Sequence, residues 1–137
     1  LSNINVVDNV VKGESYFYNE VKRIKNTLIQ ISDKTKWLVL IDELFKGTNV
    51  EDAMKCSSLV IQGLLRIKSS LFILSTHLYE IAQELKTYPN ISFKFFETNV
   101  KDDQLEFNYQ LRDGISNDRI GYLILKREGV VELLDKS

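Results

Sequence analysis

The sequence predicts an α/β domain with a mainly parallel sheet, followed by a β-hairpin and a helical tail. Two short apolar runs, at residues 37–41 and 71–74, alternate with segments whose apolar residues recur at spacings of three and four. Such runs are typical of parallel strands buried on both faces, and such spacing is typical of helices. After Pro89 the apolar spacing changes to two, which indicates antiparallel strands. Strand–helix units followed by a hairpin account for this order.

The first helix is predicted between residue 15 and about residue 31. Its apolar stripe has a residue at every third or fourth position: Phe17, Val21, Ile24, Leu28 and Ile31. Basic residues fall off this stripe, as expected of a solvated face. Ser15 stands where an N-cap would, but Glu20 is too far along the chain to complete a capping box with it.

The apolar run at residues 37–41 is predicted to form a central strand with helices on both faces. A turn at residues 47–49 follows, where Thr48 or Asn49 can cap the next helix. Residues 71–74 are predicted to form a second buried strand of the same kind.

The remaining elements are a short helix, a hairpin and a helical tail. The helix is expected near residues 79–85. The hairpin strands are expected around residues 91–96 and 105–111, because apolar and polar residues alternate there. The tail is helical in composition from about residue 119 and is broken at Gly129.

The composition excludes several classes of protein. The 137 residues are 44% hydrophobic, which is enough to fill a core, and 18 basic against 19 acidic residues give a net charge of −1. Binding to nucleic acid through a large net positive charge is therefore excluded. The single cysteine, Cys56, excludes an internal disulfide, and we expect it in the core because it lies on an apolar helical stripe. No apolar run approaches the roughly 20 residues that cross a bilayer.

One compact domain over residues 1–137 is the simplest organisation, because the chain has one proline, no Gly/Ser-rich linker and no repeat. The chain begins at Leu1 without Met and without a signal peptide, so we expect it to be a segment of a longer protein. Its cysteine content is compatible with a reduced, cytoplasmic setting.

The most prominent candidate site is the pair of carboxylates, Asp42 and Glu43, that ends the first apolar strand. Ligands of parallel α/β sheets gather at the carboxyl ends of strands. A carboxylate there can hold Mg²⁺, and a second one can orient or deprotonate a water for attack on a phosphoryl group. The ordinary alternative is that Asp42 caps a turn and Glu43 is solvated.

Two further segments could contribute to such a site. The second strand ends in Ser-Thr-His at residues 75–77, and His77 would share an edge with the carboxylates if the two strands are neighbours. A surface histidine, with Thr76 as a cap, is the alternative. Gly-Glu-Ser at residues 13–15 could bind an anion at a helix N-terminus, or simply cap the helix. A phosphate-binding loop with Gly-Lys-Ser or Gly-Lys-Thr is absent from the sequence.

Taken in order, these features resemble the ATPase domain of the MutS family of DNA mismatch-repair proteins, a branch of the ABC-type ATPases. Leu-Val-Leu-Ile-Asp-Glu at residues 38–43, followed by Phe-Lys-Gly-Thr-Asn at 45–49, is similar to the family's Walker B strand and its Gly-x-Gly-Thr-Ser loop. Ser-Thr-His at 75–77 is similar to the family's switch-histidine strand end.

The resemblance continues on both sides of these motifs. Gly-Glu-Ser-Tyr-Phe at residues 13–17, with Glu20, is similar to the family's signature segment, and residues 109–114 and 121–123 look like its late hairpin and the helix that follows. Phe45 departs from the pattern, because it stands where the first glycine of the loop is usual. Such departures suggest a divergent MutS-related protein.

The resemblance implies a half-domain of the ABC-type P-loop NTPase fold, without its P-loop segment, that uses ATP and Mg²⁺. Asp42 would position Mg²⁺, and Glu43 would activate the attacking water. His77 would contact the γ-phosphate side of the nucleotide.

The remaining roles implied by the resemblance concern a dimer. Ser15 would reach the nucleotide bound by a partner subunit, which is a second copy or a MutS-like protein, and Gly47 and Thr48 would belong to the loop between the two sites. The phosphate-gripping lysine would lie upstream of Leu1, so the full-length protein would be the ATPase and this chain alone would be inactive. DNA would be bound by domains outside the chain, and no membrane is implied.

Two other function classes remain open from the sequence. One is an ABC-type ATPase with another role in DNA repair or chromosome maintenance, although such proteins usually carry Leu-Ser-Gly-Gly where this chain has Gly-Glu-Ser-Tyr-Phe. The other is a non-catalytic interaction module that keeps the fold. Retention of Ser15, Asp42, Glu43 and His77 together argues against that module.

Overall fold

The computed structural model describes residues 2–3, 16–31, 35–102, 104–116 and 120–136. The chain divides into two compact units, Leu1–Asn90 and Ile91–Ser137. The division follows from strand pairing, because the hairpin strands of the second unit pair with each other and not with the parallel sheet of the first. A change of pairing partner of this kind needs no Pro/Gly-rich linker, so the composition did not reveal it.

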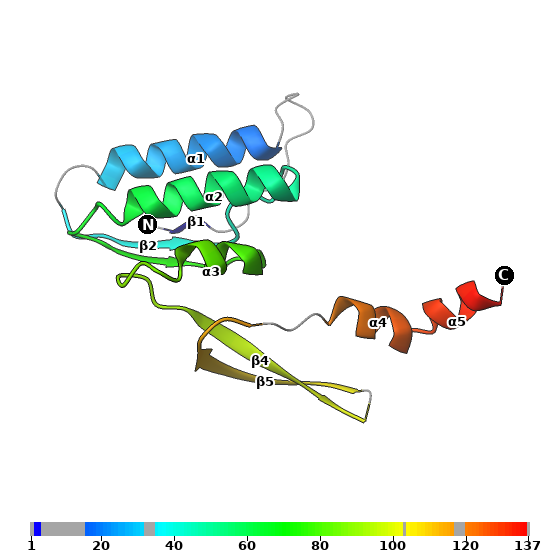
Figure 1. Cartoon of the computed structure of the whole chain (residues 1–137). Helices are drawn as coiled ribbons and strands as arrows, with labels where there is room; N and C mark the ends of the chain where they lie inside the picture. Colours follow the sequence, from blue (N-terminus) through cyan, green and yellow to red (C-terminus); the bar gives the residue numbers. More distant parts are fainter. Residues whose placement is uncertain (1, 4–15, 32–34, 103, 117–119, 137) are drawn as a thin grey trace. The chain divides into compact units, whose positions relative to one another are not determined.

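The first unit is built on a parallel sheet of three strands in the order β1-β2-β3 (Figure 1). The strands are β1 (Ser2–Asn3), β2 (Leu38–Ile41) and β3 (Leu71–Leu74). Leu38 pairs with Leu71 and Ile41 with Leu74, so the two predicted strands are parallel neighbours and their carboxyl ends lie level. β1 pairs with the other edge of β2, which makes β2 the central strand as predicted. The two residues of β1 were too few to give a periodic signal in the sequence.

Three helices accompany this sheet, and each lies where the apolar spacing predicts one. They are α1 (Tyr16–Ile31), α2 (Val50–Leu64) and α3 (Tyr79–Leu85). The structure decides between the two possible caps of α2: the Asn49 side chain accepts a hydrogen bond from the Asp52 amide at 2.9 Å. Glu51 and Asp52 then stand in the first turn, where negative charge is favourable.

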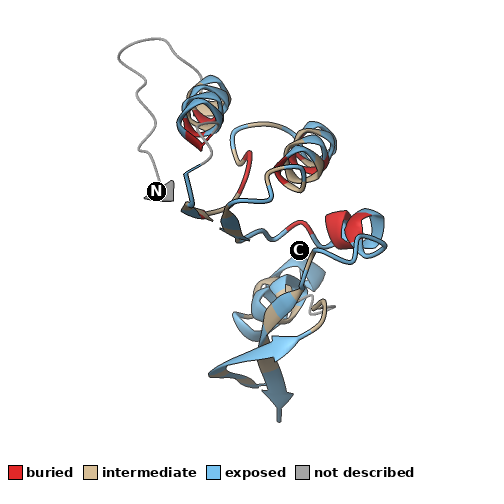
Figure 2. Ribbon diagram, turned by 90° about the vertical axis from the view of Figure 1, so that its left-hand side faces the viewer, coloured by how far each residue is buried: buried red, intermediate tan, exposed pale blue. Residues whose placement is uncertain are grey.

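The prediction that helices cover both faces of the two strands is wrong for the described residues. Figure 2 shows α1 and α2 on one side of the sheet, and Val39 and Ile41 of β2 are buried. On the alternate positions Leu38, Leu71 and Ile73 are 50%, 64% and 56% exposed. The strands follow one another in a single direction across the sheet, and right-handed crossovers in one direction place both connecting helices on the same face.

The second unit contains the predicted hairpin and two short helices. Strands β4 (Lys94–Lys101) and β5 (Gln104–Asp113) are antiparallel, with an irregularity in register between Phe96 and Thr98. The predicted break in the tail is confirmed, because Gly129 has a φ of 77° between α4 (Gly121–Arg127) and α5 (Val130–Asp135). No described helix has the length and apolar character needed to span a membrane.

Candidate functional site

The polar residues that follow β2 and β3 meet at one edge of the parallel sheet. Asp42 and Glu43 follow β2 directly, and Ser75 follows β3. The Ser75 amide donates a hydrogen bond to the Ile41 carbonyl at 2.9 Å, which continues the β2–β3 pairing up to the carboxylates. The expectation that the two polar strand ends share an edge is therefore confirmed.

Ser75 connects the two strand ends. Its hydroxyl donates to Oδ1 of Asp42 at 2.7 Å and accepts from the backbone amide of Glu43 at 3.0 Å. One side chain thus orients the Asp42 carboxylate and fixes the backbone of the next residue. Ser75 was not among the predicted site residues. Its position directly opposite Asp42, if the two strands are parallel and in this register, was the signal available.

His77 lies in the turn that leads from β3 into α3, and it is exposed. Its carbonyl accepts a hydrogen bond from the Tyr79 amide, and the Thr76 hydroxyl accepts one from the Leu78 amide at 3.0 Å. The structure therefore places His77 at the predicted edge of the sheet, and its role toward a phosphate stays a prediction.

Glu43 forms an ion pair with Lys46, three residues later in the chain. Lys46 Nζ lies 2.6 Å from Oε2 of Glu43, and the hydrogen bond to this carboxylate raises the pKa of Lys46 above its ordinary value. The backbone of Glu43 has a φ of 46°, in the left-handed region that residues other than glycine rarely occupy.

Phe45 also adopts a left-handed backbone conformation, with a φ of 57°. It stands where the resemblance expects a glycine, which enters this conformation without steric cost. Packing holds Phe45 there, because its side chain is buried and its ring lies 5.7 Å from the ring of Phe17 in α1, at 55°. Phe45 therefore has a backbone conformation that glycine favours, and its side chain adds to the core.

Glu20 of α1 is a buried carboxylate that contacts the same loop. It accepts hydrogen bonds from the Lys46 amide and the Gly47 amide, each at 2.9 Å, and only 8% of the residue is exposed. Glu20 was placed in the signature segment by the resemblance but was not among the predicted site residues. The available signal was its position on the apolar stripe of α1, three residues after Phe17 and four before Ile24, where a charged residue needs a partner.

Gly47 lies against the first turn of α1. A Cβ atom at this position would stand 2.5 Å from the Phe17 amide nitrogen and 2.6 Å from Cδ1 of Tyr16. No residue other than glycine fits unless the helix and the loop move apart. Thr48 follows as a half-buried residue, directly before the Asn49 cap of α2. Of the two loop residues named by the resemblance, Gly47 is therefore required by packing against α1.

The Gly-Glu-Ser segment at residues 13–15, including the candidate Ser15, lies outside the described residues.

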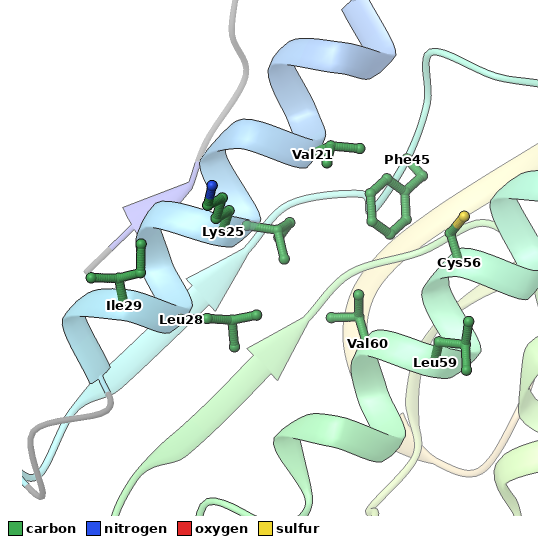
Figure 3. Close-up of a pocket in the computed structure, with 9 residues that line it drawn as sticks. Val21, Lys25, Leu28, Ile29, Phe45, Cys56, Leu59 and Val60 are labelled. Atoms are coloured by element: carbon green, nitrogen blue, oxygen red, sulfur yellow. The ribbon is translucent and has the colours of Figure 1, made fainter.

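An apolar groove of about 600 Å³ runs between α1 and α2 (Figure 3). Cys56 lines this groove and is half-buried, whereas we expected it in the core. The groove is lined by Val21, Ile24, Lys25, Leu28, Ile29, Phe45, Cys56, Leu59 and Val60.

The donor set at the strand ends fits a magnesium site of the kind that is completed by water and substrate. Asp42 and Glu43 are both half-buried and offer carboxylate oxygens, which Mg²⁺ prefers. Within the described ranges no group of three or more His, Cys, Asp or Glu side chains gathers into a cage. Mg²⁺ ordinarily takes only one or two protein carboxylates, and the Asp42 carboxylate, which accepts a hydrogen bond from the Ser75 hydroxyl, fits such a site.

Comparison with protein families gives one match that covers almost the whole chain. The family model "MutS domain V" matches residues 1–133 and therefore extends across both compact units.

Comparison with curated proteins gives mismatch-repair proteins of fungi and plants. "DNA mismatch repair protein MSH1, mitochondrial" of Arabidopsis thaliana is 31% identical over 125 residues, which are 91% of this chain and 11% of that protein. "DNA mismatch repair protein msh3" of Aspergillus oryzae is 27% identical over 83% of this chain and 10% of that protein. "DNA mismatch repair protein MSH4" of Arabidopsis thaliana is 27% identical over 79% of this chain and 13% of that protein. The chain spans about a tenth of the length of these relatives.

Proposed function

This chain belongs to the MutS family, and from that membership we propose that it is the Walker B and switch-histidine part of an ATP-hydrolysing domain that acts in DNA mismatch repair. The observation that carries the proposal is the joint arrangement of Asp42, Ser75 and Glu43 at one sheet edge. The Ser75 hydroxyl donates to the Asp42 carboxylate and accepts from the Glu43 amide. If Asp42 and Glu43 formed only a solvated turn, these two hydrogen bonds would not be expected.

In this proposal Asp42 holds Mg²⁺, which when bound neutralises charge on the nucleotide phosphates. Ser75 keeps the Asp42 carboxylate in one orientation, at 2.7 Å from its own hydroxyl. Glu43 acts as the general base toward the attacking water. Lys46 Nζ pairs with Oε2 of Glu43 at 2.6 Å and so holds the carboxylate that would accept the proton of that water.

The finer assignments of the proposal rest on the family resemblance. His77 contacts the γ-phosphate side of the nucleotide, and Gly47 and Thr48 form the loop that joins two sites. Ser15 completes the site of a partner subunit, which is a second copy or a MutS-like protein. A phosphate-binding lysine is supplied by sequence outside these 137 residues, and DNA is bound by other domains.

The test of this proposal is the magnesium dependence of ATP hydrolysis by a longer protein that carries this chain and a phosphate-binding loop. We expect Asp42→Asn to lower turnover by about 10²-fold, because it removes the charge that holds the ion. The control is Asp135→Asn at the exposed end of α5, which should leave turnover unchanged. The 137-residue chain by itself should show no turnover. Equal Mg²⁺-dependent turnover in the wild type and Asp42→Asn would contradict the role of Asp42 as the residue that holds the ion. No turnover in the wild type would contradict the proposal as a whole and favour a non-catalytic interaction module.

A second expected result concerns the serine that orients Asp42. Ser75→Ala should raise the Mg²⁺ concentration required for half-maximal turnover by about tenfold, since loss of a group that orients a metal ligand typically costs 10–100-fold. Ser75→Thr keeps the hydroxyl and should restore much of the affinity. A magnesium titration of turnover for the three proteins makes the measurement. Identical titration curves for wild type and Ser75→Ala would show that Asp42 does not depend on Ser75.

A further inference from the structure

We propose that Glu20 is a positioning residue that fixes the loop at residues 45–47 against α1 and thereby sets the place of Glu43 at the strand end. The inference rests on the proposed function, since it concerns the geometry of that site. It assigns a role to a buried side chain that contacts neither the nucleotide nor the metal in the proposal above.

The first observation is the chemistry of the Glu20 contacts. A buried carboxylate needs strong hydrogen bonds to offset its lost hydration, and the amides of Lys46 and Gly47 supply two, at 2.9 Å each. Each carboxylate oxygen accepts one of these bonds. Two bonds on two oxygens fix both the distance and the rotation of the loop relative to α1.

The second observation is that two further contacts hold the loop at residues 45–47 against α1. Gly47 lies so close to Phe17 that a Cβ atom would collide with its backbone nitrogen. Phe45, which precedes the two bonded amides in the chain, packs its ring against the ring of Phe17. The loop therefore contacts the first two turns of α1 through an aromatic pair, a carboxylate with two bonds and a glycine.

The third observation links this contact to the carboxylates. Glu20, Asp42 and Glu43 line one small cavity of about 20 Å³, which is roughly the space of a single water molecule. The Lys46 backbone amide bonds Glu20, and the Lys46 side chain pairs with Glu43. One residue thus joins α1 to the candidate base, and a shift of the Glu20 contact moves Lys46 and with it the carboxylate of Glu43.

Two measurements on the longer protein that carries a phosphate-binding loop test the inference. The variants are Glu20→Gln, which keeps the shape and one acceptor oxygen, and Glu20→Ala, which keeps neither acceptor. The first measurement is hydrogen exchange at the amides of Lys46 and Gly47, which we expect to lose protection by about tenfold or more in Glu20→Ala and by less in Glu20→Gln. The second is steady-state kinetics, where we expect kcat to fall by about tenfold to 10²-fold in Glu20→Ala, with KM for ATP changed less than about threefold.

Gly47→Ala disrupts the same contact from the side of the loop, because the added Cβ would collide with α1. This variant provides the test if Glu20→Ala does not fold. It should reproduce the loss of protection and the fall in kcat. The matched control is Glu84→Gln on the exposed face of α3, which should alter neither quantity.

The outcomes separate this inference from the proposed function. Unchanged protection in Glu20→Gln and Glu20→Ala would overturn the inference, and so would lost protection with an unchanged kcat. A fall in kcat with unchanged exchange would also overturn it, because Glu20 would then act elsewhere. If the wild-type protein does not hydrolyse ATP, the proposed function fails, while the exchange measurement still decides whether Glu20 holds the loop.

Discussion

Glu43→Gln is expected to slow ATP hydrolysis by about 10²-fold or more and to leave nucleotide binding in place, in a protein that carries this chain and a phosphate-binding loop. Glutamine has the shape of glutamate but cannot accept the proton of the attacking water. The measurement compares kcat with the dissociation constant of a non-hydrolysable ATP analogue. A mutant that turns over ATP as fast as the wild type would assign the base to another residue.

The ion pair with Lys46 requires a control of its own, because Glu43→Gln also removes that pair. Lys46→Met removes the pair from the other side and keeps the Glu43 carboxylate. If Glu43 is the base, Lys46→Met should lose far less activity than Glu43→Gln. Equal losses in both variants would show that the ion pair, and not the base, accounts for the effect. Glu84→Gln again serves as the exposed glutamate control.

Phe45→Ala is expected to lower the free energy of unfolding by about 3–5 kcal/mol, because it removes a buried aromatic side chain and its contact with Phe17. Phe45→Gly removes even more of the side chain but should be the more stable of the two, by about 1 kcal/mol. The reason is the φ of 57°, which glycine adopts freely and alanine does not. This order is the reverse of the order usual for positions in helices and strands.

Urea unfolding followed by the fluorescence of Trp37 makes the measurement, since this single tryptophan belongs to the first compact unit. Leu71→Ala, at a site that is 64% exposed on β3 of the same unit, is the matched control and should change stability by about 0.5 kcal/mol or less. An alanine variant as stable as the glycine variant would show that residue 45 does not hold a left-handed backbone in solution.

The sequence by itself determined most elements of this protein and the location of its candidate site. Local patterns predicted these elements: continuous apolar runs for β2 and β3, a spacing of three to four for α1 and an alternation of two in the hairpin. Such patterns can be recognised without the tertiary structure. Asp42 and Glu43 could be located because a strand that ends abruptly in two carboxylates is also a local pattern. The family was recognisable from the order of several short motifs, and the match over residues 1–133 confirms it.

Only the tertiary structure decided which side chains contact Asp42 and the loop that follows Glu43. Ser75 lies 33 positions from Asp42 along the chain, and Glu20 lies 26 and 27 positions from the amides it binds, so neither contact leaves a periodic trace. The exposed faces of Leu38, Leu71 and Ile73 and the division into two units depend on the direction of crossovers and on pairing partners. The left-handed backbone of Phe45 could not be predicted from the sequence either. Local sterics favour glycine there, whereas burial of the side chain and packing against the distant ring of Phe17 hold a phenylalanine in its place.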